Sequence, residues 1–211
     1  MPRTAPRPAR RGRPPSEAAE SHAAILDAVY ELLQEGSVRD LTMEAVAKRA
    51  KVGRPTLYKW WPSKSALVFA MFHERIAAHA ERSLTGTAEE VIRTKVRGLI
   101  RELNGLFGKV MADLIAEGQS EPAILRDLYE QHVSLRRAAT IADVERGKAG
   151  GEFAADTDPE LLIDAIFSPI FFLLLLRYAP LTQRYGDELV DQVLRGVRCR
   201  PSRREKDVYA G

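Results

Sequence analysis

The segment from Leu41 to Lys64 constrains the fold of this chain most strongly, because its residues predict two short helices joined by a tight turn. In the first part of this segment, apolar side chains recur at the spacing of one helical face, at Met43, Val46, Ala47 and Ala50. Thr42 has the side chain of an N-cap, whose hydroxyl accepts a hydrogen bond from a free backbone N–H. We therefore expect one amphipathic helix from Thr42 to about Lys51.

A second short helix is predicted directly after the first. Val52-Gly53 interrupts the first helix, and Pro55 suits a first helical turn, where its missing N–H is not needed. Pro62 marks the end of the second helix, because the residue before a proline avoids the α region. Leu57 faces the core in this interpretation, and the other side chains form a basic, polar and aromatic outer face. This pattern is typical of a helix-turn-helix.

The same segment resembles the helix-turn-helix signature of the tetracycline-repressor (TetR/AcrR) family. The resemblance covers residues 20–72 and rests on Thr42, Ala47, Val52, Gly53, Thr56-Leu57-Tyr58, Trp60-Trp61 and Pro62-Ser63-Lys64. Lys51 stands where the family often has glycine, and a left-handed conformation there costs about 1–2 kcal/mol. The resemblance implies a homodimer that binds double-stranded DNA and responds to a small molecule.

The rest of the chain is predicted to be helical, so the fold class is all-α. We expect a basic arm at 1–16, an N-terminal three-helix helix-turn-helix domain at 17–62, a connecting helix at 63–84, a C-terminal helical ligand-binding and dimerisation domain at 85–197, and a flexible tail at 198–211. Ser63, Thr87 and Asp158-Pro159-Glu160 are start signals for helices in this plan. The resemblance implies that the connecting helix transmits ligand occupancy to the DNA-reading domain.

Positive charge is concentrated at the end that carries the helix-turn-helix. Residues 1–64 contain 12 Lys+Arg and 7 Asp+Glu, whereas the remainder contains 20 and 22. A surface that faces phosphates requires such a surplus. Within the arm, Arg10, Arg11 and Arg13 around Gly12 resemble the core of an AT-hook, whose arginines enter a narrow minor groove. A solubilising tail without a fixed DNA contact is the alternative.

The predicted DNA contacts have two sources. The outer face of the second short helix is expected to read bases in the major groove through Arg54, Thr56 and Lys59. In that groove Arg and Lys side chains favour guanine. Pro55 can offer only an apolar contact. The resemblance assigns phosphate contacts to Thr42, Tyr58 and Lys64, and places Trp60 near the DNA backbone.

One helix is predicted to be apolar on every side. The run from Leu161 to Leu176 is interrupted only by Asp164, Ser168 and Pro169, and such a helix must be covered all round. Either it is deeply buried in the centre of its domain, or part of it packs against a twofold mate. For the second case the expected interface consists of Ile170, Leu174, Leu189, Val193 and Val197.

A hydrophobic effector is the expected ligand of the second domain. Its cavity is predicted to be lined by Phe107, Met111, Leu114, Leu128, His132, Phe167 and Phe171. An apolar lining with few polar groups favours a hydrophobic or aromatic compound. The same residues are equally consistent with a packed core.

Enzymatic, metal-binding and membrane functions find no support in the sequence. His73 and His79 are six residues apart, which is not the spacing that places two metal ligands on one helical face. No phosphate-binding glycine loop, nucleophile elbow or cofactor motif is present, so we expect neither a cofactor nor a metal. The single cysteine, Cys199, excludes an intrachain disulfide and favours the cytoplasm. The longest apolar run is shorter than the ~20 residues of a spanning helix.

The sequence therefore predicts a cytoplasmic, ligand-responsive regulator, in the form of a homodimeric repressor that binds a palindromic operator. Two alternatives come from other classes. One is an architectural DNA-binding protein that uses the arginine arm, and the other is a helical small-molecule-binding protein with secondary DNA contact.

Overall fold

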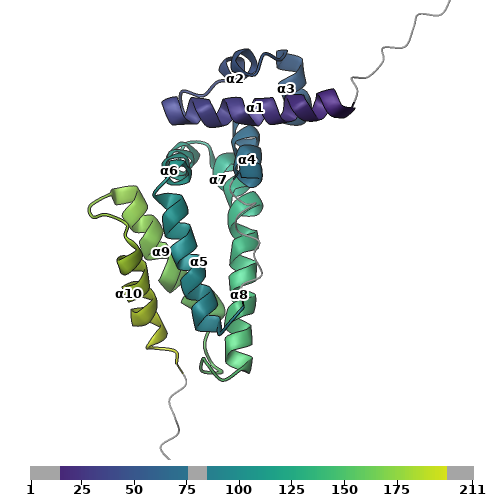
Figure 1. The fold of residues 1–211 in the computed structure, drawn as a ribbon. Coiled ribbons are helices and arrows are strands. Elements are labelled where there is room, and N and C mark those ends of the chain that lie inside the picture. Colours follow the sequence, from purple (N-terminus) through teal and green to yellow (C-terminus); the bar gives the residue numbers. More distant parts are fainter. Residues whose placement is uncertain (1–14, 76–84, 199–211) are drawn as a thin grey trace, which may run out of the picture.

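The computed structural model describes residues 15–75 and 85–198, and within them every named element is a helix. A head formed by α1 (Pro15–Glu35), α2 (Met43–Arg49) and α3 (Arg54–Trp60) lies at one end of an elongated molecule (Figure 1). Helix α4 (Lys64–Arg75) leads from the head into the second part. The arm and tail predicted at the two ends, and the predicted continuation of α4 to about Ser83, fall largely outside the described residues.

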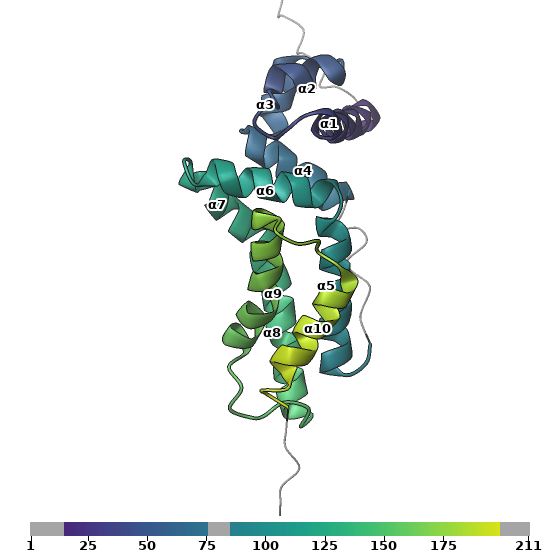
Figure 2. The same cartoon turned by 90° about the vertical axis from the view of Figure 1, so that its left-hand side faces the viewer.

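The second part, the body, contains the remaining helices. These are α5 (Ala88–Leu103), α6 (Leu106–Gly118), α7 (Pro122–Leu128), α8 (Ser134–Ala149), α9 (Pro159–Leu176) and α10 (Gln183–Leu194). In the rotated view, α6 lies across the molecule between the head and the long helices (Figure 2). The body therefore meets the head mainly through one transverse helix and through α4.

The head forms as its local signals predict. The Thr42 hydroxyl accepts a hydrogen bond from the backbone N–H of Ala45 at 3.1 Å, which caps α2. Lys51 has a φ of 53°, so the left-handed conformation expected of this non-glycine residue is present. Helix α3 begins at Arg54 with Pro55 in its first turn, and Leu57 is its one buried residue. Helix α3 is therefore anchored in the core by one side only.

The predicted start signals in the body are also present as caps. Thr87 and Glu90 form a reciprocal capping box at the start of α5, with bonds of 2.9 and 3.2 Å. The Asp158 carboxylate accepts from the N–H groups of Glu160 and Leu161 and begins α9. The Ser63 hydroxyl accepts from Ala66 at 3.1 Å at the start of α4.

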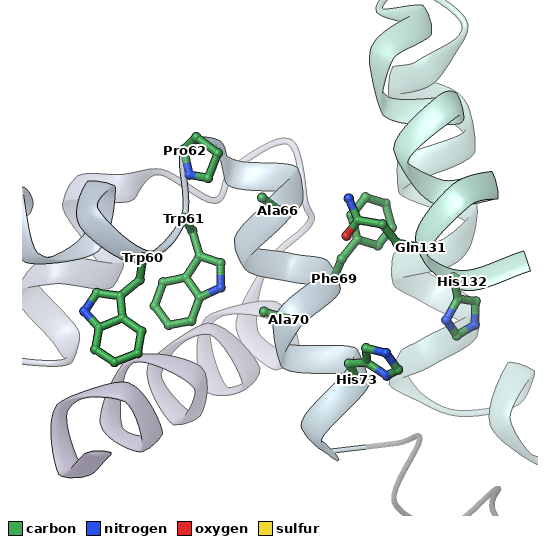
Figure 3. A pocket seen from close by; sticks show the side chains of 9 residues that line it. All are labelled: Trp60, Trp61, Pro62, Ala66, Phe69, Ala70, His73, Gln131 and His132. Atoms are coloured by element: carbon green, nitrogen blue, oxygen red, sulfur yellow. The ribbon is translucent and has the colours of Figure 1, made fainter. Parts of the chain in front are cut away.

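The chain from α7 to α8 contains an irregular turn. A π-helical turn, Tyr129–Val133, lies between the two helices. A π turn adds one residue to the helical repeat and changes the direction of the side chains that follow it. This turn directs Gln131 and His132 toward α4 (Figure 3).

Helix α9 is two-faced, which corrects the prediction of its interface residues. Ile170 is fully buried and Leu174 is 9% exposed, because both point into the core of their own protomer. A side chain that is already covered cannot supply contact area to a partner. The opposite face is exposed, with Leu161, Phe172 and Leu176 more than half accessible. The interpretation of α9 as deeply buried on all sides is therefore also wrong.

By length and hydropathy, α9 is the one helix among residues 15–75 and 85–198 that qualifies as a membrane span. Its mean hydropathy is 2.0, and 28% of its residues are buried within the chain. The buried residues of α9 belong to the same hydrophobic core as those of α5, α6 and α8. The inner face of this helix is therefore part of the globular body.

We predict opposite effects for alanine at two helical glycines. A Cβ at Gly108 would lie 1.8 Å from the backbone carbonyl oxygen of Leu103 at the corner between α5 and α6, so the backbone must shift. Gly108→Ala should lower the free energy of unfolding by about 2 kcal/mol or more. Gly98→Ala should raise it by about 0.5–1 kcal/mol, because only the end of Arg101 lies near that site. Urea unfolding at one fixed protein concentration measures both; equal effects would contradict the close approach at the corner.

Candidate nucleic-acid interface

The outer face of α3 carries the residues predicted to read DNA. Arg54, Pro55 and Lys59 are exposed and Thr56 is partly exposed. Tyr58 and Trp60 are 48% and 42% accessible, which is high for large aromatic side chains. Leu57 on the inner side has no accessible surface. The structure therefore leaves the predicted base-reading side chains accessible on one short helix, at the end of the molecule away from the body (Figure 1).

Arg54 has an acidic neighbour that sequence reasoning did not foresee. Its guanidinium forms an ion pair with the Glu44 carboxylate of α2, and both side chains are more than half exposed. An ion pair this accessible to water contributes little to stability, on the order of 1 kcal/mol or less. The guanidinium can therefore exchange this partner for an acceptor on DNA at small cost.

Lys64 does not present a free ammonium group, contrary to its predicted phosphate contact. Its Nζ donates to the carbonyl oxygen of Val38 at 2.8 Å and lies 3.3 Å from the Glu117 carboxylate of α6. The side chain is turned from the head surface toward the body, because an acid of α6 lies within its reach. Thr42 and Tyr58, the other two predicted phosphate contacts, remain exposed. Arg10, Arg11 and Arg13 lie outside the described residues.

Helix α6 fixes the head through one polar face, formed by Lys109, Asp113 and Glu117. Lys109 Nζ donates to the carbonyl oxygens of Leu33 and Gly36, at 3.2 and 2.6 Å, just where α1 ends. The Asp113 carboxylate accepts from the backbone N–H of Val38 at 3.0 Å. The three residues are four apart, so they share a helical side. This four-residue spacing is the only feature of the sequence that marks the polar face of α6, and it does not show that the face binds the head.

The two tryptophans pack on α1 through a histidine. The imidazole of His22 lies 4.9 Å from the Trp60 ring and 4.8 Å from the Trp61 ring, between centroids. Its Nδ1 is 3.4 Å from the Glu74 carboxylate of α4. His22 is therefore a packing residue of the head. Trp61 is buried at 6%, so only Trp60 of the pair is exposed to a DNA backbone.

The predicted effector residues cluster in the body, and most of them are packed. Phe107, Met111, Leu114 and Leu128 are 6% exposed or less and belong to one hydrophobic core, while His132, Phe167 and Phe171 lie at its margin. The Phe107 ring contacts His132, at 5.1 Å between centroids, and lies 5.9 Å from the Arg136 guanidinium carbon. These contacts give a continuous core around Phe107, as the packed-core alternative anticipated.

Two buried polar atoms beside Phe107 have no hydrogen-bond partner: His132 Nε2 and Arg136 Nη2. Arg136 Nη1 bonds to the Glu102 carboxylate at 2.8 Å, so the guanidinium is only partly satisfied. Burial, together with the nearby charges of Arg136 and His73, lowers the pKa of His132 to about 4. The imidazole is therefore neutral near pH 7. Among the residues that the structure describes, no group of acidic, histidine or cysteine side chains is arranged to hold a metal ion.

Comparison with known proteins gives matches for both parts of the chain. Residues 25–71 match the family described as bacterial regulatory proteins, tetR family, and residues 83–193 match the family described as tetracyclin repressor-like, C-terminal domain. The HTH-type transcriptional regulator YdeS of Bacillus subtilis (strain 168) is 33% identical over 190 residues, which are 90% of this chain and 95% of YdeS.

Solved structures agree with these matches. The TetR family transcription regulator SCO0332 superimposes with a TM-score of 0.71 and 27% identity, over 84% of this chain and 98% of SCO0332. FadR from Bacillus subtilis, solved in complex with stearoyl-CoA, gives a TM-score of 0.68 at 18% identity, over 83% of this chain and 98% of FadR. The two family matches, the similarity to YdeS over nearly the whole chain and the shared fold all agree. The chain belongs to the TetR family and is a DNA-binding transcriptional regulator, not an enzyme.

Proposed function

We propose that the chain is a cytoplasmic homodimeric repressor, which binds a palindromic operator and releases it when a small hydrophobic effector binds. The observation that carries the DNA-binding part is the exposure of α3, on which Arg54, Thr56 and Lys59 are accessible while Leu57 anchors the helix in the core. A helix this short and exposed fits the major groove. Tyr58, Trp60 and Thr42 flank it as backbone contacts.

A second copy of the chain is the proposed partner of the exposed side of α9. This outer stripe consists of Leu161, Ala165, Ser168, Phe172, Leu175 and Leu176, all exposed in the single protomer. The steps from Leu161 to Leu175 are three and four residues, and Leu176 directly follows Leu175, so the stripe is continuous along one helical side. Leu161 is 67% and Phe172 56% accessible, which is unusual for apolar side chains in water. Pairing of two such stripes about a twofold axis would cover both.

The self-pairing proposal replaces part of the predicted interface. Leu189 and Val193 on α10 are half-buried at the flank of the body, and with Val197 they stay in the proposal as peripheral contacts. The remaining exposed residues of α10 are polar, among them Arg184, Glu188 and Gln192. An apolar stripe beside a polar rim is the usual anatomy of a protein interface. Two copies joined in this way present two reading heads, as two half-sites require.

The effector part of the proposal draws on family membership and on the apolar body. FadR of Bacillus subtilis was solved with stearoyl-CoA, so a related fold holds a ligand with a long hydrocarbon chain. In this chain the aromatic and aliphatic residues around Phe107 would line the site of a hydrophobic compound. Because the core there is packed, such a ligand must displace side chains as it enters.

Phe172→Glu tests the dimer and the operator together. A carboxylate in the middle of the outer stripe opposes a second carboxylate across a twofold axis, so the variant should be monomeric by sedimentation at concentrations where the wild type is a dimer. Selection from random DNA should give paired inverted half-sites with the wild type, and the variant should bind them at least tenfold more weakly. Ala123→Glu, an exposed change on α7, is the control and should behave as the wild type. If Phe172→Glu is still a dimer, the proposed interface on α9 is contradicted. If the wild type shows only a weak preference among DNA sequences, an architectural DNA-binding protein is favoured instead.

Glu44→Gln and Arg54→Ala should change DNA binding in opposite ways. Glu44→Gln removes a negative charge beside the phosphates and releases Arg54, so affinity for selected and random DNA should rise together. Arg54→Ala should relax the preference at one base position, at a cost of about 1–3 kcal/mol. Fluorescence anisotropy on both DNA types measures the two effects. Arg101→Ala removes an exposed charge from α5 and serves as the control; an equal loss for it would show that only net charge matters.

Lys64→Ala should leave the salt dependence of DNA binding unchanged, because the ammonium is bound to Val38 and Glu117. Loss of these contacts should lower the free energy of unfolding by about 1 kcal/mol. Lys59→Ala is the matched comparison, and its salt slope should fall by about 1 because a protein with one cation fewer at the DNA surface displaces about one counterion fewer. The measurement is affinity across a series of salt concentrations. A similar fall for Lys64→Ala would restore its predicted phosphate contact.

A further inference from the structure

Helix α6, which lies across the molecule next to the head (Figure 2), holds the head through two kinds of contact. Near its start, the Phe107 ring meets the Phe72 ring of α4 edge to face, with 5.2 Å between centroids. Further along, the polar face of α6 binds the chain that leaves α1. Apolar contact keeps two surfaces together but depends little on their angle, whereas a hydrogen bond weakens steeply when its angle changes. The polar face is therefore the part of this contact that fixes the orientation of the head.

The first polar contact is made at the end of α1. The last carbonyl oxygens of a helix have no partner inside it, and they carry the negative end of its dipole. Helix α1 has no basic residue in its last turn. Lys109 supplies a cation from α6 instead, with its Nζ 2.6 Å from the carbonyl oxygen of Gly36 and 3.2 Å from that of Leu33. Lys109 thus ties the end of α1 to the body.

The second polar contact is made to Val38, which has no accessible surface. Its backbone N–H donates to the Asp113 carboxylate at 3.0 Å, and its carbonyl oxygen accepts from Lys64 Nζ at 2.8 Å. Lys64 Nζ is itself 3.3 Å from the Glu117 carboxylate, so both backbone groups of Val38 are linked to α6. A buried backbone N–H without a partner is costly. Movement of α6 away from Val38 is therefore opposed by the loss of these bonds.

The segment between these contacts and the reading helices is short and closed. Val38 lies only four residues before Thr42, which caps α2. The Ser37 hydroxyl donates to the Asp40 carboxylate at 2.6 Å. The Leu41 N–H donates to the carbonyl oxygen of Val38 at 3.2 Å. Because these bonds leave the segment little freedom, α2 and α3 take their orientation from the point where α6 holds Val38.

The separation of two reading heads matters because half-sites on DNA lie at fixed positions. One inserted base pair moves a half-site by about 3.4 Å and turns it by about a tenth of a turn around the DNA axis. In the dimer proposed above, the two bodies join along α9 and move as one unit. The distance between the two copies of α3 then depends on the angle at which each body holds its own head.

We propose that the polar face of α6 determines which half-site spacing the dimer accepts, with Lys109 and Asp113 as the positioning residues. They fix the angle between head and body in each protomer, and thereby the distance between the two copies of α3. This inference rests on the proposed homodimer and its paired operator, and it names the element that selects among operators with the same half-sites. Neither residue contacts DNA in this arrangement, so recognition of a single half-site does not depend on them.

The test compares operators that differ only in the number of base pairs between their half-sites. One or two base pairs are inserted or removed at the centre of the operator that the wild type selects, and affinity is measured by fluorescence anisotropy. The wild type should lose about tenfold or more for each change, because the second head no longer reaches its half-site. The double variant Lys109→Met, Asp113→Ala should bind all spacings within about threefold of one another, because its heads can adapt. Both proteins should bind a single half-site equally.

Matched variants separate orientation from stability. Lys95→Met removes an ammonium that bonds to Thr140 between α5 and α8, at 3.2 Å, and leaves the head untouched. It should keep the spacing preference of the wild type, as should Lys109→Arg, whose guanidinium can donate to both carbonyl oxygens. Circular dichroism and sedimentation confirm that each variant is a folded dimer. Equal relaxation by Lys95→Met, or equal losses of the double variant on single and paired half-sites, would overturn the inference.

A measurement without DNA keeps this inference apart from the proposed operator. A spin label is attached at Lys48→Cys, an exposed site on α2, in a Cys199→Ser background. The label-to-label distances in the dimer should be narrowly distributed with the native polar face and broadly distributed with the double variant. If the wild type selects no paired half-sites, the proposed function fails, and the distance distribution still decides whether the polar face orients the head. Unchanged distances, or an unchanged spacing preference in the double variant, would overturn the inference and leave the regulator intact.

Discussion

The attachment of the reading head to the body depends on the hydrogen bonds between α6 and the chain that leaves α1. Lys109 binds the carbonyl oxygens of Leu33 and Gly36, at the negative end of the α1 dipole, and Asp113 binds the N–H of Val38. Lys64 closes the same set of contacts by joining Val38 to Glu117. These bonds are directional and lie partly shielded from water, so a small displacement of α6 breaks several of them together. Any change of the body that moves α6 therefore also affects the segment that positions α2 and α3.

The exposed face of α9 and the packed interior of the body are two consequences of one sequence run. The inner side chains of α9, such as Ile170, fill the core, while the outer stripe begun by Leu161 remains uncovered in a single protomer. The core around Phe107 is dense. The molecule thus has a packed interior and, separate from it, an apolar surface that is uncovered in a single protomer.

Short-range patterns predicted most of the fold, and they succeeded where the cause is itself short-range. The caps made by Thr42, Ser63, Thr87 and Asp158 each involve residues at most three positions apart, so the local sequence is enough to predict them. The exposed side of α3 followed from the same local arguments, whereas a left-handed Lys51 was suggested only by the family resemblance. The accessibility of Arg54, Thr56 and Lys59 was predictable because Leu57 is the residue of this short helix that the pattern assigns to the core.

Long-range partners could not be read from the sequence in the same way. Lys64 was predicted to face phosphate, but it binds a residue of α6 that is 53 positions away, and α9 was apolar on both sides, so its pattern did not say which side faces inward. The π turn between α7 and α8 likewise had no signal in the sequence. The sequence by itself determined the helices, their caps and the exposed reading helix, because each depends on neighbouring residues. Only the tertiary structure decided the contacts of α6 and the free side of α9, because these depend on which distant surfaces meet.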